Sequence, residues 1–555
     1  MKLLSQSYCL VTAAMLGLPG LLWAQNAAWA KLIHGQYTET PGSMCRDYND
    51  NIYICGRMST GDLDGHSWGA AGTYDSFMAK FNSDGSYQWS VGFGGGDMGG
   101  PSDWNEGDGA WKISYDSISD ALYLAGEYQA TTWGDSAWFG PGMAIAGHGA
   151  FLAKYDLDGH CLWVRSTQNG VGGSIAVDEL GQVYLYVFSD DSYFMQNTVF
   201  DGLPSITLPN GQSVAKYSPG GELLWAKNIG HNIDGTILVR NGHLYFVGGN
   251  YGTGAMFMDE SIEENATLGV ALMGSIDTSG NAIEWLRQYP ANSNSYLPNA
   301  EATSDGGFIL SGAFKDSLFL PMDTLISSGS GSDFVCLRVD SLGNVAWHFT
   351  LDATLRSTPL VSQAPDGSFH LAFTFEGSFT FNGQTITAAH DIDFAVTRVS
   401  ADGTLLGIET NGPVSAGRIG LVTLSDGGPV LACPFTFTID LGNGHVLTGA
   451  ADIFVAKLGL ITGVQSYTMP DAGGQLLIYA NPNQGTCSIE LPPELLHEQG
   501  LVLRILDAQG QIVQESPLNI TEGTVHLDIR AQAAGTYVAE VVSGNLRYTG
   551  RIVFE

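Results

Sequence analysis

A hairpin motif that recurs along the chain constrains its fold more than any other feature. In each copy an alternating apolar strand ends at a basic residue, a turn carrying Asp-Gly or Gly-Gly follows, and a second short strand ends in Trp. This is the sequence form of a β-hairpin. Clear copies are Phe77–Trp89 (FMAKFNSDGSYQW), Phe151–Trp163 (FLAKYDLDGHCLW) and Ser213–Trp225 (SVAKYSPGGELLW). Hairpins repeated in this way predict an array or a closed ring of similar units.

The basic residue of the motif measures the period of the repeat. It recurs roughly every sixty residues, which is a spacing typical of repeat architectures. The positions are Lys80, Lys154, Lys216, Arg338, Arg398 and Lys457, and Ser275 stands in place of the basic residue in the fourth unit. A second hydrophobic strand precedes each of these positions, beginning at Ile52, Leu122, Val183, Leu244, Phe308, Phe369 and Pro429, and a further short strand and turn precede that one. Each unit therefore contains two hairpins, and units of four strands around a ring are the blades of a β-propeller. The predicted fold class is all-β, with seven four-stranded blades.

The two ends of the repeat region predict how the ring closes. The seventh unit reaches Ile453–Leu458 (IFVAKL) and has no Trp strand after it. The missing strand is found near the N-terminus, where Trp29–Gly35 (WAKLIHG) matches Trp225–Gly230 (WAKNIG). We expect this N-terminal strand to complete the last blade, because closure removes both free sheet edges.

Composition narrows the partners and the location. Lys and Arg number 22 against 56 Asp and Glu, so the formal net charge is −34 and the field repels nucleic acid. Residues 1–24 have an early lysine, a short apolar run and a small residue at the end, which predicts a secretory signal peptide cleaved between Ala24 and Gln25. No other apolar stretch approaches membrane-spanning length, so the mature protein is expected to be exported and not to span a membrane.

The repeat resembles the bacterial β-propeller repeat family. The pattern Asp-x-Phe-Val-Ala-Lys-Tyr, then Asp-Gly and Leu-Trp, is matched at Asp75–Trp89, Gly149–Trp163 and Asp452–Lys457. The resemblance covers residues 26–460, and it departs from the family where Ser275 replaces the basic residue and Gly407 replaces Trp. The resemblance implies an architecture and no particular chemistry. The propeller is predicted to extend over residues 25–458.

The chain changes character after the seventh unit. Residues 459–475 lose the period and are predicted to be a linker. From residue 476 to 555, alternating strands separated by turns predict a small β-sandwich.

This C-terminal segment resembles the type A sorting domain of the bacterial type IX secretion system. The family usually has Pro before its Asn-Pro-Asn motif, and Ala480 stands there in this chain. The residues that carry the resemblance are Asn481, Pro482, Asn483, Gly485, Asp507, Gly510, Gly535 and Tyr537. The resemblance implies that the outer-membrane type IX machinery is a partner, and that the protein is secreted or attached to the cell surface.

One loop carries a candidate ligand site, in which carboxylates alternate with aromatic side chains that are able to stack on a sugar. Its residues are Asp103, Trp104, Glu106, Asp108 and Trp111. The alternative is an exposed acidic loop whose tryptophans pack against the blades. The other recurrent residues have structural explanations: Asp-Gly pairs suit hairpin turns, and the repeated Lys suits an aliphatic stem on the surface with its ammonium in water.

Two functions remain open on the sequence. No nucleophile elbow, zinc-protease motif, phosphate-binding loop or metal-type cysteine spacing is present, and no cofactor is indicated. The sequence therefore favours a non-enzymatic secreted or surface protein that binds a glycan or protein ligand. The alternative is an extracellular carbohydrate-active enzyme, or another hydrolase or lyase, with its site at the mouth of the propeller channel.

The six cysteines after residue 24 are scattered, and most are expected to be small buried hydrophobic residues. Cys45 and Cys55 are equidistant from Asp50, where the first hairpin is expected to turn. They are therefore predicted to face each other, and export permits a disulfide between them.

Overall fold

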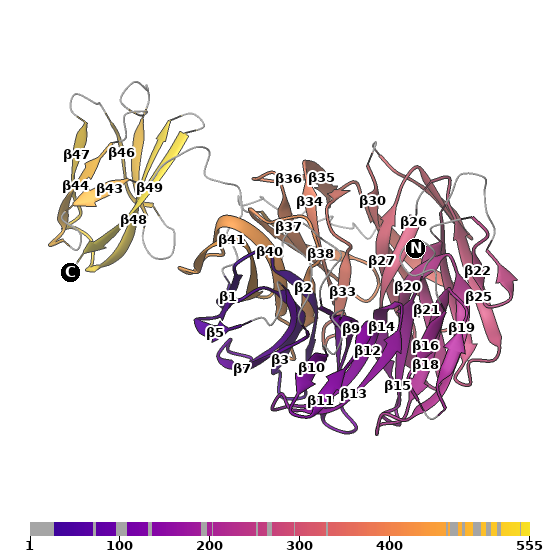
Figure 1. The fold of residues 1–555 in the computed structure, drawn as a ribbon. Coiled ribbons are helices and arrows are strands. Elements are labelled where there is room, and N and C mark those ends of the chain that lie inside the picture. Colours follow the sequence, from indigo (N-terminus) through magenta and orange to yellow (C-terminus); the bar gives the residue numbers. More distant parts are fainter. Residues whose placement is uncertain are drawn as a thin grey trace, which may run out of the picture. The chain divides into compact units, whose positions relative to one another are not determined.

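A computed structural model of the protein describes most of the chain. The described residues are 27–69, 74–95, 108–130, 136–189, 197–202, 204–250, 253–262, 269–293, 295–328, 331–461, 464–466, 476–479, 483–491, 495, 501–506, 512–518, 523–543 and 546–554. Every named element in these residues is a β-strand (Figure 1). The chain divides into two compact units, residues 1–467 and 468–555. Within the described ranges we find no helix long and apolar enough to cross a membrane.

The larger unit is built of antiparallel four-stranded groups that follow one another along the chain, which we number as sheets 1 to 7. Sheet 1 contains β2 (Thr40–Arg46), β3 (Ile52–Met58), β6 (Asp75–Phe81) and β7 (Tyr87–Phe93). Sheet 2 contains β8 (Gly109–Asp116), β9 (Ala121–Ala130), β12 (Gly147–Asp156) and β13 (Cys161–Gln168). Sheet 3 contains β14 (Val171–Val177), β15 (Val183–Phe188), β18 (Gln212–Tyr217) and β19 (Leu223–His231). Sheet 4 contains β20 (Ile233–Arg240), β21 (His243–Asn250), β24 (Val270–Asp277) and β25 (Ile283–Pro290).

The remaining sheets continue the pattern, except that the last one recruits a strand from the other end of the chain. Sheet 5 contains β26 (Ser295–Ala302), β27 (Phe308–Phe314), β30 (Asp333–Val339) and β31 (Val345–Leu351). Sheet 6 contains β33 (Leu360–Gln363), β34 (Phe369–Glu376), β37 (Asp393–Val399) and β38 (Leu405–Asn411), with β32 (Thr354–Leu355) also paired to β34. Sheet 7 contains β39 (Gly420–Thr423), β40 (Pro429–Asp440), β41 (Val446–Lys457) and β1 (Trp29–Gly35).

The N-terminal strand β1 pairs antiparallel with β41, as the split motif predicted. Trp29 lies opposite Lys457 and Ile33 lies opposite Ile453. Figure 1 shows the indigo β1 beside the orange β41, although they stand at opposite ends of the larger unit's sequence. Sheet 7 is therefore held together by residues from both ends of this unit.

The first strands of the sheets contact one another in a continuous series. β2 contacts β8, β8 contacts β14, and the series continues through β20, β26, β33 and β39, which contacts β2 again. Side chains reinforce these contacts: Ser174 and Thr236 hydroxyls on β14 and β20 hydrogen-bond at 2.8 Å, and the Thr423 amide donates to the Ser362 hydroxyl at 2.9 Å. The first strands thus surround a common space.

A small hairpin between the second and third strands of each of the first six units is a feature that the sequence analysis missed. These hairpins are β4–β5 (Gly61–Leu63, His66–Trp68), β10–β11 (Ala137–Gly140, Met143–Ile145), β16–β17 (Thr198–Phe200, Ile206–Leu208), β22–β23 (Met256–Phe257, Glu260–Ser261), β28–β29 (Ser317–Leu320, Asp323–Ile326) and β35–β36 (Ser378–Phe381, Gln384–Thr387). Several add to the outer edge of the preceding sheet: β16 pairs with β13, and β22 pairs with β19. β4 pairs with β1 in the same way, which connects sheet 7 to the first unit.

The recurrent Trp and the recurrent turn glycine also contact each other between neighbouring sheets. Gly85 has φ of +81°, a conformation that side chains disfavour, and a Cβ there would lie 2.5 Å from the Trp29 ring. The same arrangement joins Trp89 with Gly159, Trp163 with Gly221, Trp225 with Gly280, Trp285 with Gly343, and Trp347 with Gly403. Glycine is therefore required both by the turn and by the indole packed on it.

Most of the recurrent basic residues do not extend into water as expected, because they form ion pairs with an Asp at the preceding turn. Lys80 differs, since its ammonium donates to the Leu157 carbonyl. Lys154 is 4% exposed and its Nζ lies 3.7 Å from Asp116 Oδ2, while Lys216 lies 3.5 Å from Asp178. Their ammonium groups also lie over Tyr rings, at 4.8 Å from the centroid of Tyr123 for Lys154. A partner carboxylate on the neighbouring hairpin, which the motif alone does not reveal, makes burial of these charges tolerable.

The smaller unit consists of two sheets with one hydrophobic core. One sheet contains β43 (Leu477–Tyr479), β44 (Thr486–Glu490) and β47 (Thr524–Asp528). The other contains β46 (Ile512–Pro517), β45 (Val502–Leu506), β48 (Gly535–Ser543) and β49 (Leu546–Phe554). Ile489 from the first sheet and Ile505 and Ile552 from the second belong to the same buried cluster. In the segment expected to be a linker, β42 (Val464–Ser466) pairs in parallel with β38.

The prediction that Cys45 and Cys55 face each other is wrong. Cys45 lies opposite Tyr53, Cys55 lies opposite Ser43, and both thiols are free. The turn is centred one residue earlier than expected, because the Asp47 carboxylate accepts the amides of Asn49 and Asn51 at 2.8 and 3.0 Å and draws the loop around itself. The residue paired with Cys45 is therefore two positions before Cys55, and the two cysteines lie diagonally across the pair of strands.

Candidate functional site

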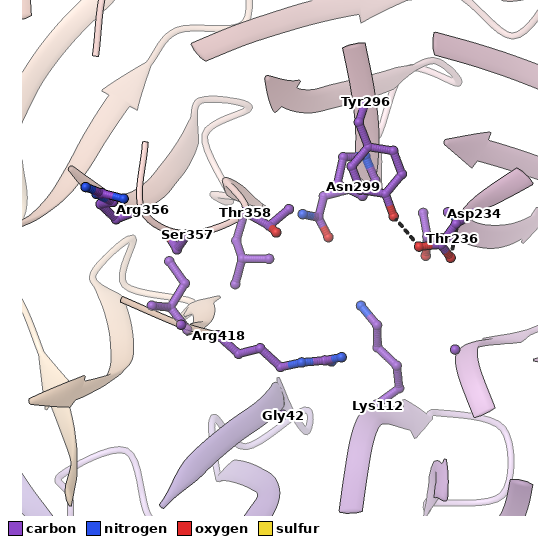
Figure 2. A pocket seen from close by; sticks show the side chains of 16 residues that line it. Gly42, Lys112, Asp234, Thr236, Tyr296, Asn299, Arg356, Ser357, Thr358 and Arg418 are labelled. Carbon is purple, nitrogen blue, oxygen red and sulfur yellow. Dashed lines mark hydrogen bonds between the residues drawn. The ribbon is translucent and has the colours of Figure 1, made fainter. Parts of the chain in front are cut away.

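A pocket of about 530 Å³ lies where the first strands of the sheets surround their common space. All seven sheets or the segments leading into them contribute to it (Figure 2). The lining residues are Gly42, Lys112, Gly173, Asp234, Gly235, Thr236, Tyr296, Pro298, Asn299, Arg356, Ser357, Thr358, Leu360, Gly417, Arg418 and Ile419. Its volume is in the usual range for small-ligand sites.

Irregular backbone at the same level explains why side chains converge there. The ladder shifts register between Pro41 and Ser43 in β2, between Ala110 and Lys112 in β8, and between Gly172 and Ser174 in β14. A further shift separates Tyr296 from Asn299 in β26. Such β-bulges release a residue from strict alternation and redirect its neighbours, so the strands present both glycine backbone and long polar side chains to the pocket.

Two cations enter the pocket from different sheets. Lys112 projects from β8 and Arg418 from the segment before β39, and Figure 2 shows their charged ends directed into the same space. Neither side chain forms a hydrogen bond or salt bridge with another described residue. Burial among protein atoms is the main cause that lowers the pKa of Lys112 and of Arg418, and the nearby Arg418 lowers the pKa of Lys112 further.

An indole supports the guanidinium of Arg418. The Arg418 Cζ lies 4.5 Å from the centroid of the Trp111 ring, and the Arg57 Cζ lies 5.9 Å from it. The Trp111 Nε1 donates to Glu127 Oε1 at 3.1 Å, and burial raises the pKa of the Glu127 carboxyl. Cation–π contact and the indole hydrogen bond hold this side of the pocket in place.

A hydrogen-bonded acid and phenol face the cations. The Tyr296 hydroxyl donates to Asp234 Oδ2 at 2.7 Å, and the Gly235 amide donates to Asp234 Oδ1 at 2.8 Å. Burial raises the pKa of Asp234. Figure 2 shows this pair across the pocket from Lys112 and Arg418, with Asn299 next to Tyr296 and Thr358 farther along the same side. Asp234 and Arg418 attract each other through space, but they form no salt bridge within the described residues.

The third cation of the lining is already neutralised. Arg356 donates through Nε to Glu376 Oε2 at 2.8 Å, and its Nη2 also contacts that oxygen. Lys112 and Arg418 are therefore the cations of the lining that form no salt bridge with a described residue, although Glu127 and Asp234 attract Arg418 through space.

The structure places only part of the sequence-predicted ligand loop. Asp103, Trp104 and Glu106 lie outside the described residues and remain predictions. Asp108 is 1% exposed and accepts the amides of Gly95 and Gln129 at 2.7 and 2.8 Å, so it organises backbone. Trp111 is 8% exposed and lies beside the pocket under Arg418.

Sequence reasoning missed the pocket itself. Lys112 directly follows Trp111 of the candidate ligand loop, but Arg418 is about three hundred positions later and belongs to no motif. The sequence signal for these two residues is the scarcity of basic residues in an acidic chain, because a Lys or Arg outside the recurrent position is then a candidate for a functional role. Within the described residues no group of three or more His, Cys, Asp or Glu side chains is arranged to hold a metal ion.

Four of the predicted sorting residues have clear structural roles. Asn483 is buried; its amide donates to the Val553 carbonyl and its side chain accepts the Gly485 amide, both at 2.8 Å. Gly485 has φ of +89°, and Gly535 begins β48. The Tyr537 hydroxyl donates to the Ala533 carbonyl at 2.5 Å. Asn481, Pro482, Asp507 and Gly510, like Ala24 and Gln25, lie outside the described residues.

Residues 477–555 match the family described as the secretion system C-terminal sorting domain. This is the type IX sorting domain that the sequence resembled, and it marks proteins delivered to the extracellular medium or the cell surface. The protein is therefore located in the extracellular medium or at the cell surface. Its C-terminal unit interacts with the secretion machinery.

Comparison with solved structures gives distant similarities over most of the chain. The chain is similar to the Dos1 propeller at 10% identity and a TM-score of 0.39, over 79% of this chain and 97% of that one. It is also similar to a DUF4221 member from Bacteroides vulgatus at 10% identity and a TM-score of 0.30, over 78% of this chain and 99% of that one. The similarity to a Synechocystis apocarotenoid oxygenase mutant is at 13% identity and a TM-score of 0.34, over 79% of this chain and 95% of that one. No curated protein matches the chain.

Proposed function

We propose that the protein is a non-enzymatic binding or adhesion protein of the cell surface or medium. In this proposal residues 25–458 are a seven-bladed β-propeller closed by β1, and residues 476–555 are a small β-sandwich that serves as the sorting signal. The series of contacts from β2 through β39 and back to β2 supports the ring. The pairing of β1 with β41 supports its closure.

The pocket at the centre of the larger unit is the observation that carries the binding function. It is lined by residues from many parts of the chain, and its polar side chains come from separate sheets. A preformed cavity with a few convergent polar groups is the usual form of a small-ligand site. A glycan end or a side chain of a partner protein would fit this description.

The alternative is an extracellular hydrolase or lyase with its site in the same channel. Glycoside hydrolysis generally uses two carboxyl groups that flank the scissile bond. The lining contains one, Asp234, and it is hydrogen-bonded to Tyr296. Two cations that form no salt bridge with a described residue, beside one acid, favour holding an anion over acid–base cleavage, so we place binding first. Release of products from a bound glycan by the purified protein would reverse this order.

A binding screen with a blocked pocket tests the proposal. The chain from Gln25 to Glu555 is applied to arrays of glycans and of surface proteins, beside a Thr358→Trp variant. Thr358 is exposed in the pocket, so the indole is expected to fill the cavity and abolish the main signal without unfolding the protein. Thr380→Trp, at an exposed position of β35 outside the pocket lining, is the matched control. Binding that survives Thr358→Trp would place the ligand elsewhere.

A further inference from the structure

We infer that the central pocket selects a small oxyanion, the carboxylate or sulfate group of an acidic sugar, which Lys112 and Arg418 hold together. This inference rests on the proposed binding function and names the ligand class of the same site.

The first argument is the position of the charge. The chain has 22 basic residues against 56 acidic ones, and the recurrent basic residues are mostly committed to ion pairs within the repeats. Lys112 and Arg418 nevertheless come together in one cavity without a salt bridge in the described part of the chain. Two like charges repel, and an anion between them removes that repulsion. An oxyanion presents two or more acceptor oxygens to these donors.

The second argument is that the donors are held in position before a ligand arrives. Arg418 Cζ lies 4.5 Å from the centroid of the Trp111 ring, and the Trp111 indole donates to Glu127. Lys112 is anchored on β8 next to a bulge and opposite Ala125. Ordering of flexible cations is a main cost of binding an anion, and this arrangement lowers it.

The third argument concerns the rest of the ligand. Asp234 accepts from Tyr296, and Asn299 and Thr358 add an amide and a hydroxyl to the lining. The Asn299 Nδ2 donates to the Pro359 carbonyl at 2.7 Å, which holds this amide in place. These groups suit the hydroxyls of a sugar, whereas a wholly apolar anion would leave Asp234 without new partners. The volume of about 530 Å³ accommodates a monosaccharide or the end residue of a chain.

Titration calorimetry of the chain from Gln25 to Glu555 at fixed ionic strength tests the inference. The probes are D-glucuronate, glucose 6-sulfate and glucose, which share a ring and differ in the acidic group. We expect at least one acidic sugar to bind about 10-fold or more tightly than glucose, since hydrogen bonds to charged groups are the stronger ones. The preference between the two acids identifies carboxylate or sulfate as the group recognised.

Variants then assign the effect to the two cations. Lys112→Met and Arg418→Gln are each expected to weaken the acidic sugar about 10-fold or more while leaving the melting temperature unchanged. Lys227→Met and Arg287→Gln make the same changes outside the pocket lining, Arg287 also lying over an indole at 5.5 Å, and are expected to have no effect. Equal affinity for glucose and the acids, or equal losses in the control variants, would overturn the inference while leaving a binding function intact. Absence of binding by both acids would overturn it as well, and the array screen would then decide separately whether the protein binds anything at the pocket.

Discussion

The indole Nε1 of Trp29 donates a 3.0 Å hydrogen bond to the backbone carbonyl of Ser83. Trp29 belongs to β1 in sheet 7, and Ser83 lies in the hairpin turn of sheet 1. The equivalent indoles of Trp89 and Trp163 donate to Leu157 and Pro219 in the next sheet along the chain, both at 3.1 Å. The junction between the last sheet and the first is thus made by the same contact as the internal junctions.

Replacing Trp29 with Ala is expected to lower the free energy of unfolding by about 3 kcal/mol, a cost typical of a buried aromatic side chain. Trp29 is 7% exposed, and its removal exposes the turn glycine it covers. Urea denaturation provides the measurement. Trp138→Ala is the control, because Trp138 is 57% exposed and should change stability little. Equal, small effects of both substitutions would mean that β1 does not secure the junction.

The buried ion pair of Lys154 is expected to matter far more than its exposed counterpart at Lys457. Lys154→Met leaves the Asp116 carboxylate, whose side chain is 1% exposed, without its cation, and this should cost about 3 kcal/mol. Lys457→Met leaves Asp426, which is 57% exposed, in contact with water, and this should cost less than about 1 kcal/mol. Chemical denaturation of both variants measures the difference, and similar costs at the two sites would contradict it.

Stability is expected to fall as the pH rises through neutrality, because of groups beside β1. Burial raises the pKa of Glu39 to about 7, and the hydrogen bond to Asp452 raises the pKa of His34. Both folded pKa values exceed the unfolded ones, so the stability these protons provide is complete at low pH and is lost as pH rises through the folded values. For Glu39 the loss between pH 5 and pH 8 should be about 2 kcal/mol.

Glu39→Gln tests this assignment, since glutamine keeps the shape and cannot lose a proton. The variant should have a flatter dependence of unfolding free energy on pH than the wild type. Glu222→Gln at an exposed position should leave the slope unchanged. A slope that is identical in wild type and Glu39→Gln would rule out Glu39 as a titrating group of the fold.

The thiols of the exported protein are expected to be free and protected. Burial raises the pKa of Cys55 to about 12 and also raises that of Cys45. A thiol reagent at pH 8 should therefore react slowly with the native protein, because the thiolate is the reactive form. After denaturation without a reductant all six cysteines beyond residue 24 should react. A smaller number would indicate a disulfide.

Removal of the C-terminal unit is expected to stop export without unfolding the larger unit. The cut is best placed after Ser466, because β42 pairs with β38 and belongs to the larger unit. The truncated protein should accumulate folded in the periplasm, and immunoblots of periplasm, cell surface and medium measure this. Normal amounts at the surface would show that residues 477–555 are not needed as the address.

The sequence predicted those features that local chemistry repeats. Trp29–Gly35 was paired with Ile453–Leu458 because both halves of one motif were visible, and the glycine turns were visible because φ > 0 demands them. The register of the first hairpin was not predictable, since it depends on how the Asp47 side chain organises its own loop. The pocket was less predictable still: Lys112 and Arg418 approach each other only when sheets 2 and 7 are in place.

The pairing of β1 with β41 also sets the order in which the protein is able to form. A chain made from its N-terminus presents β1 before the other strands of the larger unit, yet the strand that β1 must join appears only at the end of that unit. Until then an alternating strand with an indole stands as an unpaired edge, a hazard for aggregation. Because this contact has a very high sequence separation, its closure is expected to be the slow step of folding. A bacterium that exports this protein must therefore keep β1 from pairing with other chains until the whole larger unit, including β41, is available for folding.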